Sequence, residues 1–159
     1  MVRIGVTGHM NLTAETAALV SEAVRARLRE VDGELVGVSC IARGADSLFA
    51  EAVLDAGGSL EVVLPSRDYR EAKVKADHLE LFDALVAKAD RVRVMDFDHA
   101  GREAYVAANE AVLGSIDELV AVWDGQPSGG AGGTADVVEE ARARGLPVTV
   151  IWPEGAARE

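Results

Sequence analysis

The sequence predicts a single α/β domain, with an open, mostly parallel sheet of about six strands and helices on both of its faces. Short runs rich in Val, Ile and Leu alternate with longer segments of helical apolar spacing, which is typical of repeated strand–helix units around a parallel sheet. The length of 159 residues fits one domain with one substantial hydrophobic core. We expect this domain to span residues 3–153 and residues 154–159 to form a short tail.

Six segments are predicted as strands because they are short, apolar and rich in β-branched residues. They are residues 3–7, 35–40, 60–64, 91–96, 119–123 and 148–152. Five longer segments have the apolar spacing of helices that pack one face on a sheet. They are residues 13–30, 45–56, 69–89, 102–115 and 134–144. Each helix follows a strand, so the carboxyl ends of the strands meet the helix amino termini at one edge, where open α/β sheets bind ligands.

The charge of the chain argues against nucleic acid and membrane surfaces as partners. The sequence has 16 Lys and Arg against 27 Asp and Glu, a formal net charge of −11, which opposes broad contact with phosphate backbones or anionic lipid. No apolar run of the sequence is long enough to cross a bilayer. The single cysteine, Cys40, cannot form an internal disulfide and so favours a reducing compartment. We therefore expect a cytoplasmic protein.

The most informative segment is a glycine-rich stretch, residues 123–136, between the fifth strand and the helix after it. Glycines let backbone N–H groups approach an anion closely, and the start of a helix presents unpaired donors with partial positive charge. We predict a phosphate-binding loop here; the alternative is a flexible loop in which Thr134 simply caps the helix. The predicted ligand-binding residues of this stretch are Gly125, Gly129, Gly130, Gly132, Gly133, Thr134 and Asp136.

A second segment, residues 41–46, occupies the equivalent place after the second strand. Arg43 could bind a phosphate through two parallel hydrogen bonds, and Gly44 opens the next helix. Asp46 could accept hydrogen bonds from ribose hydroxyls. The alternatives are a surface ion pair for Arg43 and a simple helix-start carboxylate for Asp46. We predict that all three residues contact the ligand.

The first and third strands supply further candidates at the same edge. Gly8 permits close approach of the backbone where the first strand ends. His9 could hydrogen-bond a ligand, although satisfying local backbone groups is the simpler role, and we interpret it as a contact, not a catalyst. Arg67 follows the third strand and could lie at the rim, with a plain helix-start loop as the alternative.

Three more side chains complete the predicted site. Tyr105 and Asn109 are four residues apart, so on a helix they share one face and could read a base or sugar; ordinary packing is the alternative. Asp124, after the fifth strand, could bind ribose or a hydrated cation, or form a turn. We expect no obligatory cofactor and no metal site, although a divalent cation could accompany a phosphorylated ligand.

The order of these motifs resembles the SLOG superfamily, which groups Rossmann-like domains related to DNA-processing protein A and to the Lonely Guy enzymes. The resemblance covers nearly the whole chain. It is carried by Gly-Val-Thr-Gly-His at residues 5–9, Ala-Arg-Gly-Ala-Asp at 42–46, Val-Val-Leu-Pro at 62–65, Ala-Val-Trp-Asp-Gly at 121–125 and Gly-Gly-Thr-Ala-Asp at 132–136. It implies a Rossmann-like fold, a nucleotide-derived ligand and a homodimer.

The resemblance to Lonely Guy enzymes implies hydrolysis of nucleoside monophosphates, but the catalytic motif is broken. Their signature, Gly-Gly-x-Gly-Thr-x-x-Glu, ends in a glutamate where this chain has Val137. Asp136 lies one position early, which on a helix rotates a side chain by about 100°. We therefore predict binding or sensing of a nucleotide-derived small molecule. The alternatives are a phosphoribohydrolase and an interaction scaffold. The resemblance to DNA-processing protein A also suggests single-stranded DNA as a ligand. The acidity of the chain and its few aromatic residues argue against this ligand.

Overall fold

Six parallel strands form one sheet in the order β4-β3-β2-β1-β5-β6 in the computed structural model, which describes residues 1–127 and 133–159. Every pair of neighbouring strands is parallel. The arrangement confirms the predicted α/β class and the Rossmann-like sheet. The strands are β1 (Val2–Gly8), β2 (Leu35–Ser39), β3 (Ser59–Leu64), β4 (Arg91–Val94), β5 (Glu118–Val122) and β6 (Val148–Ile151).

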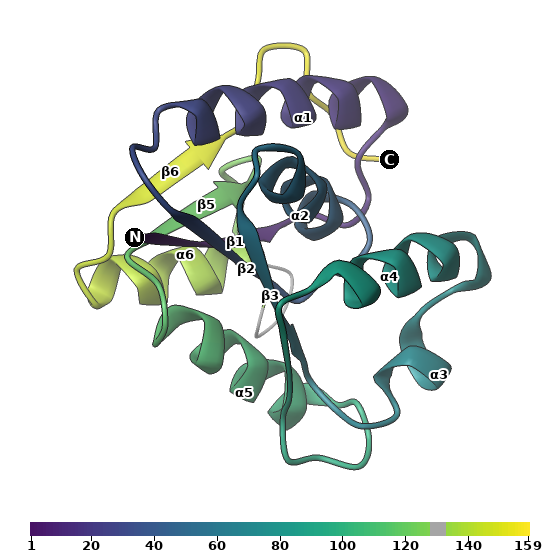
Figure 1. Cartoon of the computed structure of the whole chain (residues 1–159). Helices are drawn as coiled ribbons and strands as arrows, with labels where there is room; N and C mark the ends of the chain where they lie inside the picture. The colour runs from purple at the N-terminus through teal and green to yellow at the C-terminus, as the bar shows by residue number, and fades with distance from the viewer. Residues whose placement is uncertain (128–132) are drawn as a thin grey trace.

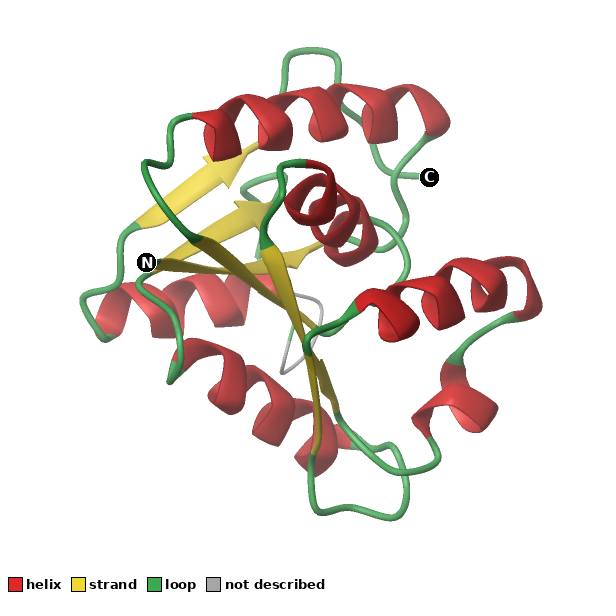
Figure 2. Cartoon of the chain, in the orientation of Figure 1, coloured by secondary structure: helices red, strands yellow, loops and turns green. Residues whose placement is uncertain are grey.

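Helices cover both faces of the sheet. Figures 1 and 2 show α1, α2 and α4 on one face, and α5 and α6 on the other. No helix within the described residues is both long enough and apolar enough to span a membrane. The helices are α1 (Ala14–Arg29), α2 (Ala45–Asp55), α3 (Tyr69–Lys73), α4 (Ala76–Lys88), α5 (Arg102–Leu113) and α6 (Thr134–Ala143).

The strand order reverses direction between β1 and β5. The chain builds outward from β1 to β4 and then returns to place β5 on the other side of β1, with Gly8 opposite Val122 at the carboxyl end of the pair. At such a reversal the connections leave toward opposite faces, and a crevice opens beyond the strand ends. The topology therefore puts the predicted site between the ends of β1 and β5.

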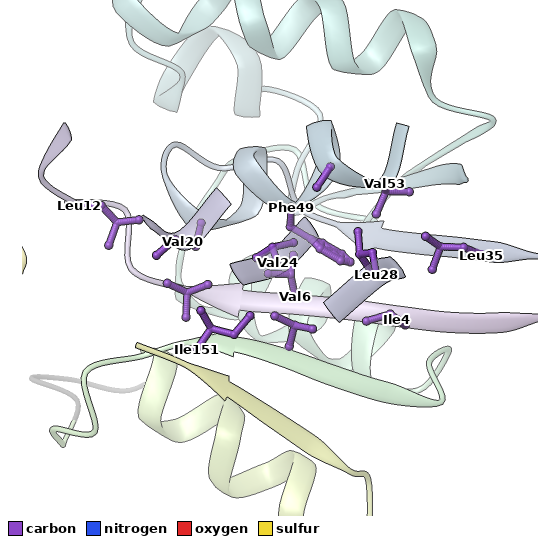
Figure 3. Packing of buried hydrophobic residues seen from close by; sticks show 14 residues of the cluster. Ile4, Val6, Leu12, Val20, Val24, Leu28, Leu35, Phe49, Val53 and Ile151 are labelled. Atoms are coloured by element: carbon purple, nitrogen blue, oxygen red, sulfur yellow. The ribbon is translucent and has the colours of Figure 1, made fainter. Parts of the chain in front are cut away.

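Apolar side chains between the helices and the sheet form the core. The helix α1 buries Val20, Val24 and Leu28, which are four residues apart and so share one helix face. Figure 3 shows these side chains with Phe49 of α2, packed over β1. On the other face, a second cluster joins α5 and α6 to the sheet. These clusters fix the strand ends from which the site is built.

The segment predicted as one helix over residues 69–89 is two helices. Val74 and Lys75 have extended ψ values of 116° and 156° between α3 and α4. The sequence has no Gly or Pro there. The break is instead held by tertiary contacts, because Val74 packs on the third core cluster and the buried His78 bonds the carbonyl oxygen of Ile41 through Nε2 at 3.1 Å.

The segment predicted as a short tail packs against the loop after β1. Leu12 and Arg158 form an antiparallel bridge, and the N–H of Thr13 donates to the carbonyl oxygen of Ala157 at 3.3 Å. The N–H of Ala157 donates to Oγ1 of Thr16 at 2.8 Å. Residues 157–159 thus reach the carboxyl edge of the sheet.

Candidate ligand-binding site

A cavity of about 740 Å³ lies at the carboxyl edge of the sheet. We call it the large cavity. Its walls come from the ends of β1, β2, β3 and β5, from α5, and from the start of α6. Its volume is in the range of pockets that bind small molecules and cofactors. It is lined by Val6, Thr7, Gly8, His9, Met10, Asn11, Cys40, Ala42, Asp46, Pro65, Tyr69, Lys73, Tyr105, Ala108, Asn109, Trp123, Gln126, Pro127, Gly133, Thr134, Ala135 and Arg158.

The first residues of α6 form one wall. Gly133 is the residue before the helix, with ψ 175°, and it lines the cavity together with Thr134 and Ala135. The first N–H groups of a helix lack intrahelical partners and carry partial positive charge. This wall is therefore suited to an anion, as the sequence predicts for Gly133 and Thr134. The predicted residues Gly129, Gly130 and Gly132 lie outside the described residues, and Gly125 forms a turn with φ 82° beyond the lining.

A half-buried carboxyl group also lines the large cavity. Asp46 lies in the first turn of α2 and lines the cavity. Burial raises the pKa of its carboxyl group to about 7, and the N–H of Ala42, 3.4 Å from Oδ2, offsets part of that effect. Near neutral pH this carboxyl group exists in both forms. It can therefore accept a hydrogen bond from a hydroxyl group or donate one to a carbonyl oxygen.

The loop between β2 and α2 is held in an unusual conformation. Ile41 is fully buried and has φ 46°, which is an outlier for a β-branched residue. Its N–H donates to Oγ of Ser39 at 3.0 Å, and its carbonyl oxygen accepts from His78 at 3.1 Å. Strained backbone of this kind is maintained where the surroundings determine it, and it is common at ligand sites. Here it directs the chain from β2 toward Asp46.

His9 joins the ends of β1 and β5. The N–H of Asp124 donates to its Nε2 at 3.1 Å, so Nε2 is an acceptor and the ring is neutral, with its hydrogen on Nδ1. Burial and the charge of Arg158 hold the pKa of His9 below its ordinary value of 6.5. The ring is nearly perpendicular to that of Trp152, with a centroid distance of 5.6 Å. His9 therefore lines the cavity and accepts a hydrogen bond from the backbone of Asp124.

Asp124 lies behind this wall rather than in it. Its carboxylate accepts from the N–H of Gln126 at 3.0 Å and pairs with Arg158 at 3.4 Å. Partial desolvation would raise its pKa, but the hydrogen bond from the N–H of Gln126 and the contact with Arg158 hold the pKa below its ordinary value. The turn-forming role is therefore what the structure shows for Asp124. Arg158, in contrast, lines the cavity.

Aromatic and amide groups form the side nearest α5. Tyr105 and Asn109 share one face of α5 and both line the cavity. The rings of Tyr105 and Tyr69 are nearly perpendicular, with a centroid distance of 6.4 Å. The two rings offer an apolar surface, and the amide of Asn109 offers a donor and an acceptor. This side is suited to a base or sugar.

Besides Gly125 and Asp124, four more predicted residues in the described part of the chain are absent from the lining of the large cavity. Arg43 lines a smaller cavity beside it. Arg67 is exposed and pairs with Asp96 and Asp98. Gly44 supports the backbone, since its Cα faces the carbonyl oxygens of the loop after β1. Asp136 lies in the first turn of α6 but outside the lining.

The structure also brings in residues that the sequence reasoning missed. Asn11, Tyr69, Lys73 and Arg158 line the large cavity. Tyr69 follows a strand end closely enough that its position could have signalled it. Arg158 comes from the predicted tail, and no local pattern connects it with Asp124. Among the residues that the structure describes, no three His, Cys, Asp or Glu residues are placed to hold a metal ion.

The position of the missing catalytic glutamate is part of the core. Val137 is 6% exposed and packs in the cluster with Leu119, Ala108 and Val112. Its side chain is not in the lining of the large cavity. A carboxylate introduced there would be buried among apolar groups at a large desolvation cost. The chain therefore departs from the Lonely Guy motif in packing as well as in sequence.

Comparison with known proteins gives matches to solved structures, whereas no family model and no curated protein sequence matches the chain. DNA processing protein A from Streptococcus pneumoniae superposes with a TM-score of 0.70 and 18% identity, over 98% of this chain and 52% of that protein. This chain thus spans about half of its length. The Helicobacter pylori protein of the same name superposes with a TM-score of 0.69 and 16% identity, over 99% of this chain and 68% of that protein. The Chlamydomonas molybdenum cofactor carrier protein superposes with a TM-score of 0.55 and 18% identity, over 94% of this chain and 74% of that protein.

One expectation from composition is wrong. The net charge argued against nucleic acid as a partner. However, the structurally similar DNA processing protein A from Helicobacter pylori is described as binding single-stranded DNA. Net charge is a sum over the whole surface, whereas a strand contacts one groove, so an acidic total does not exclude a local basic site. The superpositions confirm the sequence resemblance at the level of the fold. The chain shares the Rossmann-like α/β fold of these solved structures.

Proposed function

We propose that the chain binds a nucleotide-related ligand in the large cavity, with a phosphate at the amino terminus of α6. The observation that carries the proposal is the position of this cavity at the reversal between β1 and β5, where Gly133 and Thr134 form one wall. Backbone N–H groups at a helix start bind phosphate without needing a basic side chain. This is consistent with an acidic protein.

The other walls match the remaining parts of a nucleotide. Tyr69 and Tyr105 offer ring surfaces for a base or sugar, and Asn109 can pair with polar atoms on a base edge. Asp46 can accept a hydrogen bond from a ribose hydroxyl when ionised. Each wall is apolar with a few polar groups, the composition that small-ligand sites require.

We propose binding without turnover. The residue in the place of the hydrolase glutamate is the buried Val137, and departure of a base needs charge stabilisation and proton transfer by correctly placed groups. The test is incubation with nucleoside monophosphates and chromatography for free base. Release at about 1 s⁻¹ or faster would contradict this part of the proposal, and Asp46 would be the first residue to examine.

Replacing Asn109 by Ala is expected to weaken nucleotide binding about fivefold, because one hydrogen bond contributes roughly 1 kcal/mol and a factor of ten in affinity corresponds to about 1.4 kcal/mol. Calorimetry should compare wild type with the variant, using the four common nucleoside monophosphates and a short oligothymidylate. The oligonucleotide belongs in the panel because a single strand presents the same nucleotide unit.

The matched control is Glu103→Ala, on the same helix but exposed and outside the lining of either cavity. It should bind as the wild type does. Equal affinity in the Asn109→Ala protein, or no binding of any member of the panel at millimolar concentration, would contradict the proposal.

A further inference from the structure

A smaller cavity of about 260 Å³ adjoins the large one. We call it the small cavity. The two share Met10, Asn11, Tyr69 and Lys73 as lining residues, so a ligand in one could extend past this common wall into the other. The remaining lining residues of the small cavity are Arg43, Val74, Lys75, His78 and Glu159.

The small cavity is positively charged in an acidic protein. Arg43, Lys73 and Lys75 line it against a single carboxylate, that of Glu159, whereas the whole chain has a net charge of −11. In the described part of the chain, neither lysine takes part in an ion pair. Cations gathered around a concave site and left without acidic partners favour an anionic ligand.

Arg43 is held only loosely by its two acidic neighbours. Its Nη2 lies 3.5 Å from Glu159 and its Nη1 lies 3.9 Å from Asp77, and all three side chains are exposed. Exposed pairs at such distances contribute little free energy. A phosphate could therefore displace the Glu159 carboxylate and form shorter, charge-assisted bonds with the guanidinium group.

The floor of the small cavity is fixed in place. His78 is 8% exposed, and its Nε2 lies 3.1 Å from the carbonyl oxygen of Ile41 and 3.3 Å from Oγ of Ser47. The ring of Phe82 packs against it at a centroid distance of 6.4 Å. These contacts hold the start of α4 and the break after α3. The break places Lys73 and Lys75 in the same wall.

We propose that the small cavity is a second anion subsite, which binds a phosphate of the ligand other than the one at α6. The proposal rests on the proposed function, and it names the ligand class as a nucleotide that carries more than one phosphate. A nucleoside diphosphate, a nucleoside 3′,5′-bisphosphate and successive phosphodiesters of a single strand share this chemistry. Their different spacing of phosphates is what the experiment separates.

A second phosphate on the ligand is expected to raise affinity at least tenfold, because the cationic side chains of the small cavity would form charge-assisted hydrogen bonds with it. Calorimetry should compare thymidine 5′-monophosphate, 5′-diphosphate, 3′,5′-bisphosphate and a short oligothymidylate. In Arg43→Gln and Lys75→Gln proteins the gain from the second phosphate should fall at least fivefold. Affinity for the monophosphate should be unchanged.

Two controls separate local contact from general charge. Lys88→Gln removes an exposed cation from the far end of α4, outside both cavities, and should retain the gain. Glu159→Gln should increase the gain, because it removes the competing carboxylate. An equal loss in Lys88→Gln and Lys75→Gln proteins, or no gain in the wild type, would overturn the subsite.

A direct titration keeps this inference separate from the proposed function. Inorganic phosphate should shift the backbone amide NMR signals of residues 43 and 73–78 in the wild type and much less in the Lys75→Gln protein. If nucleotides fail to bind but these shifts occur, the proposed function is wrong and the subsite stands. If monophosphates bind in the large cavity but these signals do not move, the subsite is wrong and the proposed function stands.

Discussion

Replacing Gly44 by Ala is expected to destabilise the fold by about 4 kcal/mol. Gly44 has φ 84° and ψ −127°, a conformation that costs a residue with a Cβ about 1 to 3 kcal/mol. A Cβ here would also lie 2.6 Å from the carbonyl oxygen of His9 and 2.8 Å from that of Met10. Overpacking against backbone atoms adds roughly 1 to 3 kcal/mol.

Urea unfolding of Gly44→Ala and Gly57→Ala proteins measures the two contributions separately. Gly57 has a similar φ of 81°, but a Cβ at this position would have no neighbouring atom within 4 Å, so its substitution adds strain without a clash. We expect a loss of about 1 kcal/mol for Gly57→Ala. Equal losses for the two variants would show that the close approach to His9 and Met10 contributes nothing.

The same contact links stability to the site. The N–H of Ala45, next to Gly44, donates to the carbonyl oxygen of His9 at 3.2 Å. The loop after β1 and the start of α2 are thereby joined, and both supply walls of the large cavity. Gly44 was predicted as a ligand contact, and the structure gives it a supporting position instead.

Replacing Asp46 by Asn is expected to stabilise the protein at pH 8 by up to about 4 kcal/mol and to leave its stability near pH 4 almost unchanged. Burial raises the pKa of the folded carboxyl group from 3.8 to about 7. Between these values the folded protein binds more protons than the unfolded chain, so the free energy of unfolding falls as pH rises. Each pKa unit corresponds to about 1.4 kcal/mol, and Asn has no proton to lose.

Urea unfolding at intervals from pH 4 to pH 8 tests this expectation as the difference between variant and wild type. His9 acts in the opposite direction, because its lowered pKa makes the protein less stable as pH falls below 6.5, but it is common to both proteins and cancels. Asp32→Asn, at an exposed position, is the matched control and should give a flat difference. A flat difference for Asp46→Asn would mean that folding does not raise the pKa of its carboxyl group.

Asp46 also illustrates how burial serves a binding site. Ionising this carboxyl group costs free energy in the free protein. A ligand hydroxyl group that donates a hydrogen bond to the carboxylate stabilises the charged form and so offsets part of that cost. A ligand that contacts Asp46 in this way should bind more tightly as pH rises through about 7. The stability lost at high pH and the affinity gained there have the same physical origin.

The sequence by itself determined the order of elements and the edge of the sheet at which the large cavity lies. Strand and helix periodicity is local, so the six strands and most helix bounds follow from runs of a few residues. For the same reason Gly8, at the end of β1, and Asp46, at the start of α2, line the large cavity, as do Tyr105 and Asn109 on one face of α5. These predictions needed only the geometry of parallel strands and of one helix turn.

The tertiary structure alone decided which of these residues meet. Arg43 follows a strand end, yet the unusual backbone of Ile41 and Gly44 brings it to the small cavity, beside Lys73 and Lys75. The break between α3 and α4 has no local signal, because it depends on burial of Val74 and His78. Arg158 reaches Asp124 through pairing of residues far apart in the chain. Net charge is a sum over the whole chain, and residue spacing is a local pattern. A cavity, in contrast, is lined by side chains that are distant in the sequence and that packing brings together.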